Sequence, residues 1–434
     1  MPQSNMNKQI LTLAIPSIIS NISIPLVSAV DTILMGHLST LHLAALGIVG
    51  MIFLFLYGTI NFLRMGTTGI TAQAYGRKDN EDITLTLYRA LFVAFSLGVL
   101  FILFKDTILS ISFYLMNVES SYYSYAQSYF DIRIFTAPAV FMTYVLIGWF
   151  FGMQNAIFPL LITIVINVAN ILLSYYFVNT LEWGIEGAAY GTLLSQYVGL
   201  ALGFVLLWRY KNEFHPTSFS HILKGRELLR FLHINRDIFI RTLILTFGFA
   251  FFYAQAAKHS AETLAVMILL LQFVIWFAYV LDGFANAAES LVGKFYGAKD
   301  WQAFMRVIRY IFWWGFSFTL GYMALYLLLG ERIVMLYTNQ NELINQTVEY
   351  LPYVVVLPLL SFVGYVWDGV FIGMTATKAM RDSVFIATLL YIGFFYLLKE
   401  WHFILALWGS FMLFFLFRGL LQTWLFIRKG TLLQ

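Results

Sequence analysis

An isolated carboxylate, Asp31, lies inside the first long apolar run of the sequence, residues 10–35. On a helix it would share one face with other polar residues, namely Ser17, Asn21, Ser28 and Thr32. An ionised carboxylate at the middle of a bilayer costs about 2.5–3.5 kcal/mol on insertion scales, so such a residue normally faces a protein interior or a watery cavity. Low dielectric disfavours its charged form, and the carboxyl group can then bind and release protons. Asp31 is therefore a candidate coupling site for ion-driven transport, with a helix-packing contact to Arg or Asn as the alternative.

Three further apolar runs carry polar stripes at helical spacing. The run 157–178 holds Thr163, Asn167, Asn170 and Ser174, spaced four, three and four residues apart. The run 263–293 holds Asp282, Asn286, Glu289 and Gly293, and the run beginning at 344 leads to Ser361, Tyr365, Asp368 and Thr375. Interhelical hydrogen bonds, worth about 0.6–2 kcal/mol each, would explain the neutral side chains, whereas the carboxylates favour function. The sequence predicts a polar pocket in each half, with Arg64 as a candidate counter-ion.

The composition identifies the class of protein. Hydrophobic residues make up 60% of the 434 positions and charged residues 11%, and the mean hydropathy is +0.78, against roughly 25% charged residues in soluble domains. Twelve apolar runs are candidates to span a bilayer: 10–35, 43–74, 85–104, 122–151, 157–178, 185–208, 238–257, 263–293, 303–329, 344–374, 383–398 and 403–427. Prolines within them, such as Pro25, are expected to bend the helices. We predict an all-α polytopic membrane protein.

Lysine and arginine are distributed unevenly between alternate loops. The loops after even-numbered runs and the chain ends hold most of them, whereas the opposite loops hold only Lys105, Lys258, Arg332 and Lys399. Because basic residues remain on the cytoplasmic side, both termini are expected in the cytoplasm, with the chain in the inner or plasma membrane. The sequence has no cysteine, which excludes disulfides and thiolate metal sites. We expect no metal, no other cofactor and no nucleic-acid partner.

Two short motifs recur at one offset. Tyr75-Gly-Arg-Lys-Asp79 returns as Tyr296-Gly-Ala-Lys-Asp300, and Gly148-Trp-Phe-Phe-Gly-Met153 returns as Gly369-Val-Phe-Ile-Gly-Met374. Both motifs return 221 residues later, from Tyr75 to Tyr296 and from Gly148 to Gly369. We call this separation the repeat offset. Each motif ends an even-numbered run, so both halves would have the same topology, related by a pseudo-two-fold axis around a central cleft. The predicted boundaries are an N-lobe of six helices at 1–213, a cytoplasmic linker at 214–235 and a C-lobe of six helices at 236–434.

Four tracts of the sequence resemble the DinF-type branch of the multidrug and toxic compound extrusion (MATE) family. They are Val30-Asp31-Thr32, residues 63–76, Leu281-Asp-Gly-Phe284 with Glu289, and Trp367-Asp-Gly-Val-Phe-Ile-Gly373. The resemblance covers nearly the whole chain. It implies a twelve-helix, two-lobe exporter of amphipathic, often cationic compounds in exchange for protons or sodium ions. It also implies that Asp31 is the protonation or drug site of the N-lobe, with Asn167 and Asn170 as polar partners, and that Ser174 replaces a second aspartate found in several members.

The neutral surroundings of Asp31 favour a proton as the coupling ion. Sodium must replace its water shell with several oxygens, preferably from more than one carboxylate, whereas one proton needs one acid. A sodium site formed by Glu289 and Asp368 in the second half is the rival. Neither of these acids, nor Asp282, has an acidic counterpart in the first half at the repeat offset, so the halves are expected to be chemically unequal.

Other functions need residues that the sequence does not offer in the right places. A flippase for lipids or lipid-linked oligosaccharides would need several basic residues for pyrophosphate, and our prediction puts only Arg64, Arg133 and Arg418 within spans, with Arg133 paired to Asp131. A membrane enzyme would need a nucleophile or an acid–base set, and an ATP-driven pump would need the Gly-x-x-x-x-Gly-Lys motif, which is absent. We therefore expect a secondary antiporter for amphipathic small molecules, monomeric in the lipid bilayer, and not an enzyme.

Overall fold

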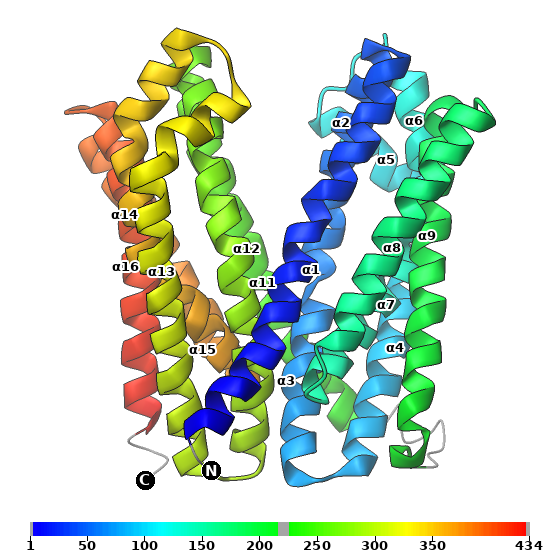
Figure 1. The fold of residues 1–434 in the computed structure, drawn as a ribbon, viewed down its shortest axis with the longest axis vertical. Helices are drawn as coiled ribbons and strands as arrows, with labels where there is room; N and C mark the ends of the chain where they lie inside the picture. Colours follow the sequence, from blue (N-terminus) through cyan, green and yellow to red (C-terminus); the bar gives the residue numbers. More distant parts are fainter. Residues whose placement is uncertain (1–2, 216–224, 431–434) are drawn as a thin grey trace. The chain divides into compact units, whose positions relative to one another are not determined.

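The computed structural model describes residues 3–215 and 225–430, and the regular secondary structure of these residues is helical throughout (Figure 1). Helices of the first half are α1 (Gln3–Leu38), α2 (Thr40–Ile60), α3 (Phe62–Arg77), α4 (Asn80–Leu103), α5 (Lys105–Leu115), α6 (Tyr123–Arg133), η1 (Ile134–Thr136), α7 (Ala137–Gly152), α8 (Ile157–Tyr175), η2 (Tyr176–Thr180), α9 (Gly184–Leu207) and η3 (Trp208–Glu213). Those of the second half are α11 (Gly225–His259), α12 (Ala261–Gly297), α13 (Trp301–Tyr337), α14 (Asn341–Gly373), α15 (Thr377–Leu398) and α16 (Phe403–Gly430).

Eleven helical segments of the described chain are long and apolar enough to cross a membrane. Helix α1, which contains the apolar run 10–35, makes the twelfth. The predicted all-α polytopic membrane fold is therefore confirmed. The predicted run 43–74 divides at Asn61 into α2 and α3, which together form one crossing segment, Thr40–Arg77.

The chain forms two compact units. The first consists of Ile19–Asn235, and the second consists of Met1–Ile18 together with Arg236–Gln434. Helices α1 and α11 therefore each contribute residues to both units. The lobes predicted from the sequence differ from these units in two respects, because the segment Met1–Ile18 groups with the second half and the predicted linker 214–235 groups with the first. The predicted lobe boundaries stay a prediction.

Helix caps recur at the repeat offset. The Ser39 and Ser260 hydroxyls each accept a hydrogen bond from the backbone N–H three residues on, at 3.3 and 2.9 Å. The Asp79 and Asp300 carboxylates do the same at the start of α4 and α13, both at 3.0 Å. A side-chain oxygen at this position satisfies an N–H group that has no partner within the helix. The same residue type therefore starts the equivalent helix in each half.

Helix ends recur at the same offset. Lys78 and Lys299 adopt left-handed backbone conformations with φ of 59° and 57°, and Gln154 and Thr375 do so with φ of 65° and 53°. A left-handed residue ends a helix by turning its N–H back onto the last carbonyl groups. The two recurring sequence motifs thus mark two recurring turns.

Glycines bring equivalent helix pairs into close contact. In segments 148–152 and 369–373, glycines four residues apart let α7 pack on α3 and α14 pack on α12. A Cβ added to Gly148 would collide with the backbone of Arg64, and one added to Gly369 would collide with that of Ala285. Small residues allow such close approach between membrane helices. Since Arg64 and Ala285 are themselves separated by the repeat offset, the repeat extends to individual contacts.

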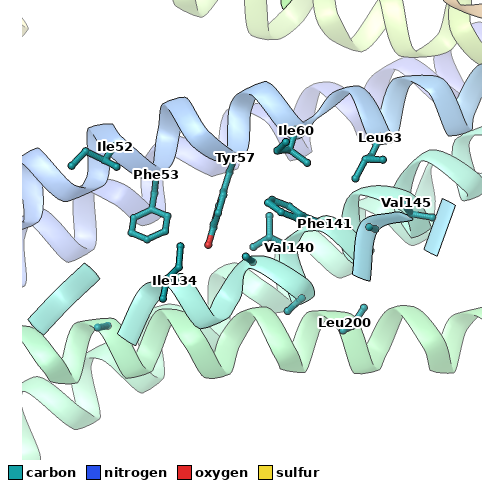
Figure 2. Close-up of a cluster of buried hydrophobic side chains, with 14 of the residues drawn as sticks. Ile52, Phe53, Tyr57, Ile60, Leu63, Ile134, Val140, Phe141, Val145 and Leu200 are labelled. Atoms are coloured by element: carbon teal, nitrogen blue, oxygen red, sulfur yellow. The ribbon is translucent and has the colours of Figure 1, made fainter. Parts of the chain in front are cut away.

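An aromatic core in the first unit fixes α2 against α7. Figure 2 shows Phe53 and Tyr57 pointing from α2 towards the segment that carries Ile134 and Phe141. The Tyr57 ring packs edge-on against Phe53 and Phe141, with centroids 5.1 and 5.3 Å apart. Its hydroxyl shares a 2.8 Å hydrogen bond with the Thr136 Oγ1, so the buried polar atom is satisfied. This core positions the neighbouring end of α6, where Arg133 lies.

Candidate functional site

Asp31 is buried in the first unit, with 8% of its surface exposed. The Arg133 guanidinium of α6 and the Ser174 hydroxyl of α8 both interact electrostatically with its carboxylate. Asp31 also interacts with Tyr129, which is completely buried on α6. The predicted acid therefore faces charged and polar groups inside the unit.

Tyrosine and asparagine side chains connect this acid to α9. The Tyr129 hydroxyl accepts a hydrogen bond from Arg133 Nη1 at 3.0 Å and interacts with Thr192. Asn170 Nδ2 in turn donates to Thr192 Oγ1 at 3.1 Å. We call the six residues Asp31, Tyr129, Arg133, Asn170, Ser174 and Thr192 the Asp31 cluster. It draws on α1, α6, α8 and α9.

Three oxygens of the Asp31 cluster are buried without a hydrogen bond of ordinary geometry. They are Asp31 Oδ1, Asn170 Oδ1 and Ser174 Oγ, all in the described part of the chain. Buried polar atoms nearly always have a partner, so each of these oxygens has hydrogen-bonding capacity left for a water molecule, a proton or an ion. This donor set contains one carboxylate.

Arg133 is the residue whose position the sequence did not reveal. The expected pair with Asp131 is wrong, because Asp131 accepts a 2.9 Å hydrogen bond from Lys105 of α5. The Arg133 guanidinium lies 4.9 Å from the centroid of the Phe53 ring and 5.5 Å from that of Tyr129. Aromatic faces attract such a cation, and they hold it where it acts on Asp31.

Other predicted residues of the first half have partners elsewhere. Thr163 Oγ1 donates to the Pro159 carbonyl of its own helix at 3.0 Å. Asn167 Nδ2 donates to Ser23 Oγ at 2.9 Å, which ties α8 to α1 two residues before Pro25. Pro25 lies within the continuous helix α1, and its role as a bend stays a prediction. The side chain of Ser28 lies outside the described residues.

Arg64 does not appear among the groups that act on Asp31. Its charge acts on Tyr144 of α7, and its backbone lies against Gly148. Its role as a counter-ion stays a prediction.

In the second unit, Asp368 of α14 is held by two arginines and an amide. Arg241 of α11 and Arg418 of α16 both form ion pairs with Oδ2, while Gln422 Nε2 donates to Oδ1 at 2.7 Å. Arg418 is 1% exposed and lies over the Tyr365 ring, 5.4 Å from its centroid. We call Arg241, Asp368, Arg418 and Gln422 the Asp368 cluster. Arg241 lies within a membrane-crossing helix and within the predicted run 238–257, just as Arg89 lies in 85–104 and Arg306 in 303–329. The statement that only three arginines lie within spans is therefore wrong.

Two further predicted acids of the second half act on this cluster. Glu289 is buried and Asp282 is exposed, and both interact electrostatically with Arg241. Asn286 Nδ2 donates to Ser17 Oγ of α1 at 2.6 Å. The described residues contain no group of three or more His, Asp or Glu arranged to hold a metal ion.

Comparisons with known proteins agree on one family. The MatE family model matches residues 16–176 and again residues 238–397, one range in each half of the chain. The chain is 33% identical to DNA damage-inducible protein F of Escherichia coli over 95% of its length and 90% of that protein's. It is 23% identical to a probable multidrug resistance protein NorM of Thermotoga maritima, over 78% of this chain and 74% of that protein.

Solved structures have the same fold. A structure described as MATE in the bent conformation superposes with a TM-score of 0.91 at 21% identity, covering 98% of this chain and 96% of that one. A transporter of Pyrococcus furiosus, described as having a binding pocket of reversed polarity, superposes with a TM-score of 0.87 at 20% identity, covering 99% of this chain and 97% of the other.

Proposed function

The chain belongs to the MatE family of multidrug and toxin extrusion transporters, and we propose that it exports amphipathic, cationic compounds in exchange for protons that bind Asp31. One observation carries the choice of ion. Asp31 is the one carboxylate in a cluster whose other acceptors, on Asn170 and Ser174, are neutral. A sodium ion would leave much of its desolvation cost uncompensated there, whereas a proton needs a single acid.

Proton binding would change two interactions of Asp31 at once. Protonation removes the negative charge that attracts Arg133 and that would attract a cationic substrate. It also turns the carboxyl group into a donor, for which the neighbouring Ser174 hydroxyl is an acceptor. Protons from outside would therefore release the substrate, and deprotonation towards the cytoplasm would restore affinity for the next one, by alternating access.

The names of relatives support a small-molecule cargo. The Thermotoga maritima relative is a probable multidrug resistance protein, and a human relative at 21% identity is named multidrug and toxin extrusion protein 1. We propose the same class of cargo for this chain, acting as a monomer in the inner or plasma membrane with both termini in the cytoplasm.

A flippase for lipid-linked oligosaccharides is the second candidate, because Arg241 adds to the intramembrane arginines. A pyrophosphate group would need free guanidinium groups. Arg241 and Arg418, however, both bind Asp368. This pairing favours the drug exporter over the flippase.

Uptake of a fluorescent cationic dye into inverted membrane vesicles tests the proposal. Vesicles receive either an acid interior or a sodium-rich interior, with Asp31→Asn vesicles as the matched control. We expect the acid interior to drive uptake, and nigericin in potassium-balanced buffer to abolish it. Undiminished uptake with the pH gradient collapsed and the sodium gradient standing would defeat the proton assignment. If neither gradient drives uptake of any amphiphile, the flippase is favoured.

A further inference from the structure

We propose that Arg241 and Arg418 are built-in counter-ions that prevent Asp368 from binding a coupling cation, so that ion binding is confined to the first unit. This inference deepens the proposed function, on which it rests for the role of Asp31. According to this inference, the two arginines determine which half of the transporter responds to the ion gradient.

The contacts of Asp368 leave little of its carboxylate for an added ion. Two guanidinium groups share Oδ2, and the Gln422 amide donates to Oδ1. A cation ligand must offer lone pairs to the metal. Here the groups that occupy the lone pairs come from α11 and α16, so a cation would have to displace side chains that are buried between helices of the same unit. Arginine stays protonated in proteins, so neither guanidinium group can free the carboxylate by losing its charge.

The charges of the Asp368 cluster balance without an ion when Glu289 is counted with it. Arg241 and Arg418 are positive, while Asp368 and Glu289 are negative, and all four are buried. Asp282, the other acid that acts on Arg241, is exposed. Adding a proton or a sodium ion to a neutral buried group of charges costs desolvation with no unpaired charge to offset it. The balance therefore disfavours binding of a single cation.

The position equivalent to the Asp31 cluster is also closed. At the repeat offset, Phe252, Tyr391 and Phe395 stand where the first unit has Asp31, Asn170 and Ser174. All three are at most 1% exposed and belong to one hydrophobic core. Aromatic rings thus replace the acid, the amide and the serine hydroxyl, and the one oxygen that remains, the buried hydroxyl of Tyr391, is no carboxylate. The acids of the second unit lie at other positions.

Removing one positive charge should allow the Asp368 cluster to bind a cation. In Arg241→Gln the amide can still donate to Asp368, but the four buried charges become one positive and two negative. The variant should then bind one cation, either a proton or a sodium ion. Arg241→Lys keeps the charge and should behave like the parent, and Arg332→Gln, an exposed arginine on α13, is the control for charge loss.

Thermal unfolding of the purified full-length chain in detergent provides the test. Every variant carries Asp31→Asn, which removes the proposed ion-binding acid of the first unit. Each variant is measured over a pH series in sodium or potassium chloride at equal ionic strength. We expect no sodium-specific stabilisation in Asp31→Asn alone. Asp31→Asn/Arg241→Gln should be stabilised, relative to Asp31→Asn, by sodium or by falling pH.

Two results would overturn the inference. One is a sodium-specific shift in Asp31→Asn that Asp368→Asn then removes, and this comparison decides the matter even if Arg241→Gln fails to fold. The other is a folded Arg241→Gln variant, with an unchanged gel-filtration profile, that responds to neither ion. Because the assay measures binding and not export, failure of proton coupling at Asp31 would appear in the vesicle experiment and leave this result unchanged.

Discussion

Gly148 lies so close to the backbone of Arg64 that no Cβ fits between α7 and α3, and Gly369 meets Ala285 in the same way in the second half. The two contacts link a sequence repeat to a packing rule, since membrane helices associate closely through small residues. In both halves, therefore, glycine allows two helices to pack closely, α7 on α3 in the first half and α14 on α12 in the second.

Replacing either glycine should destabilise the protein by a similar amount. Gly148→Ala and Gly369→Ala each place a methyl group against the backbone of the neighbouring helix. Overpacking of this kind lowers the free energy of unfolding by about 1–3 kcal/mol or more. Thermal unfolding in detergent measures the loss. Gly321→Ala on α13, where a Cβ meets nothing within 4 Å, is the control and should be nearly neutral. Three equal melting temperatures would contradict the packing argument.

Asp31→Asn should reduce proton-driven export to background, because the amide keeps the shape of the side chain but cannot titrate. Dye efflux from cells or uptake into inverted vesicles measures the change. Thr163→Val is the matched control on α8, since its hydroxyl donates only within its own helix. The coupling role would be lost if Asp31→Asn retained export, or if Thr163→Val lost as much.

Gly191→Ala should impair export through the position of Ser174. A Cβ at Gly191 on α9 would lie 2.7 Å from the backbone nitrogen of Ser174 and 2.8 Å from its Cα, so α8 and α9 must separate. The hydroxyl that acts on Asp31 then moves. Dye transport at matched protein levels is the readout, and Gly47→Ala, with nothing within 4 Å, is the control. Normal transport by Gly191→Ala would show that the position of Ser174 is unimportant.

Arg418→Met should strongly destabilise the second unit. Removing one partner from a buried ion pair costs about 3–5 kcal/mol, because the remaining charge loses its compensation. The double variant Arg418→Met/Asp368→Asn leaves Arg241 with Glu289 and should recover part of the loss, a non-additivity that thermal unfolding can detect. The exposed Arg332→Met should change little. Strictly additive losses would mean that the two residues are not coupled.

Lys105→Met should have a small effect that does not vary across neutral pH. The hydrogen bond from Lys105 to Asp131 raises the pKa of the lysine above its usual value of 10.5. A raised pKa contributes stability that is fully present below the unfolded-state value and is lost only as pH rises through the folded-state value. The pair is partly exposed, so its loss should cost about 0.2–1 kcal/mol. Thermal unfolding of both proteins over a pH series checks this, and a difference that vanishes between neutral and mildly alkaline pH would contradict it.

The sequence predicted most of the helices because apolar length is a strong signal in a membrane protein. It missed α5, whose 11 residues are too few to span a bilayer. The helical period correctly grouped Asn170 with Ser174 on one face of α8. Periodicity carries no information about which helices become neighbours, however. The electrostatic effect of Arg133 on Asp31, and the ion pairs of Arg241 and Arg418 with Asp368, depend on tertiary packing, and only the structure revealed them.

The recurring caps, turns and glycine contacts have a practical consequence for protein engineering. They separate a scaffold, which both halves share, from the side chains that it carries, which differ. Residues at positions 252, 391 and 395 occupy the scaffold positions of Asp31, Asn170 and Ser174, so one frame carries an acid with polar partners in one half and a buried aromatic core in the other. An acid placed at position 252 would replace a fully buried phenylalanine, so a second acid site would require the aromatic neighbours to be replaced together with it.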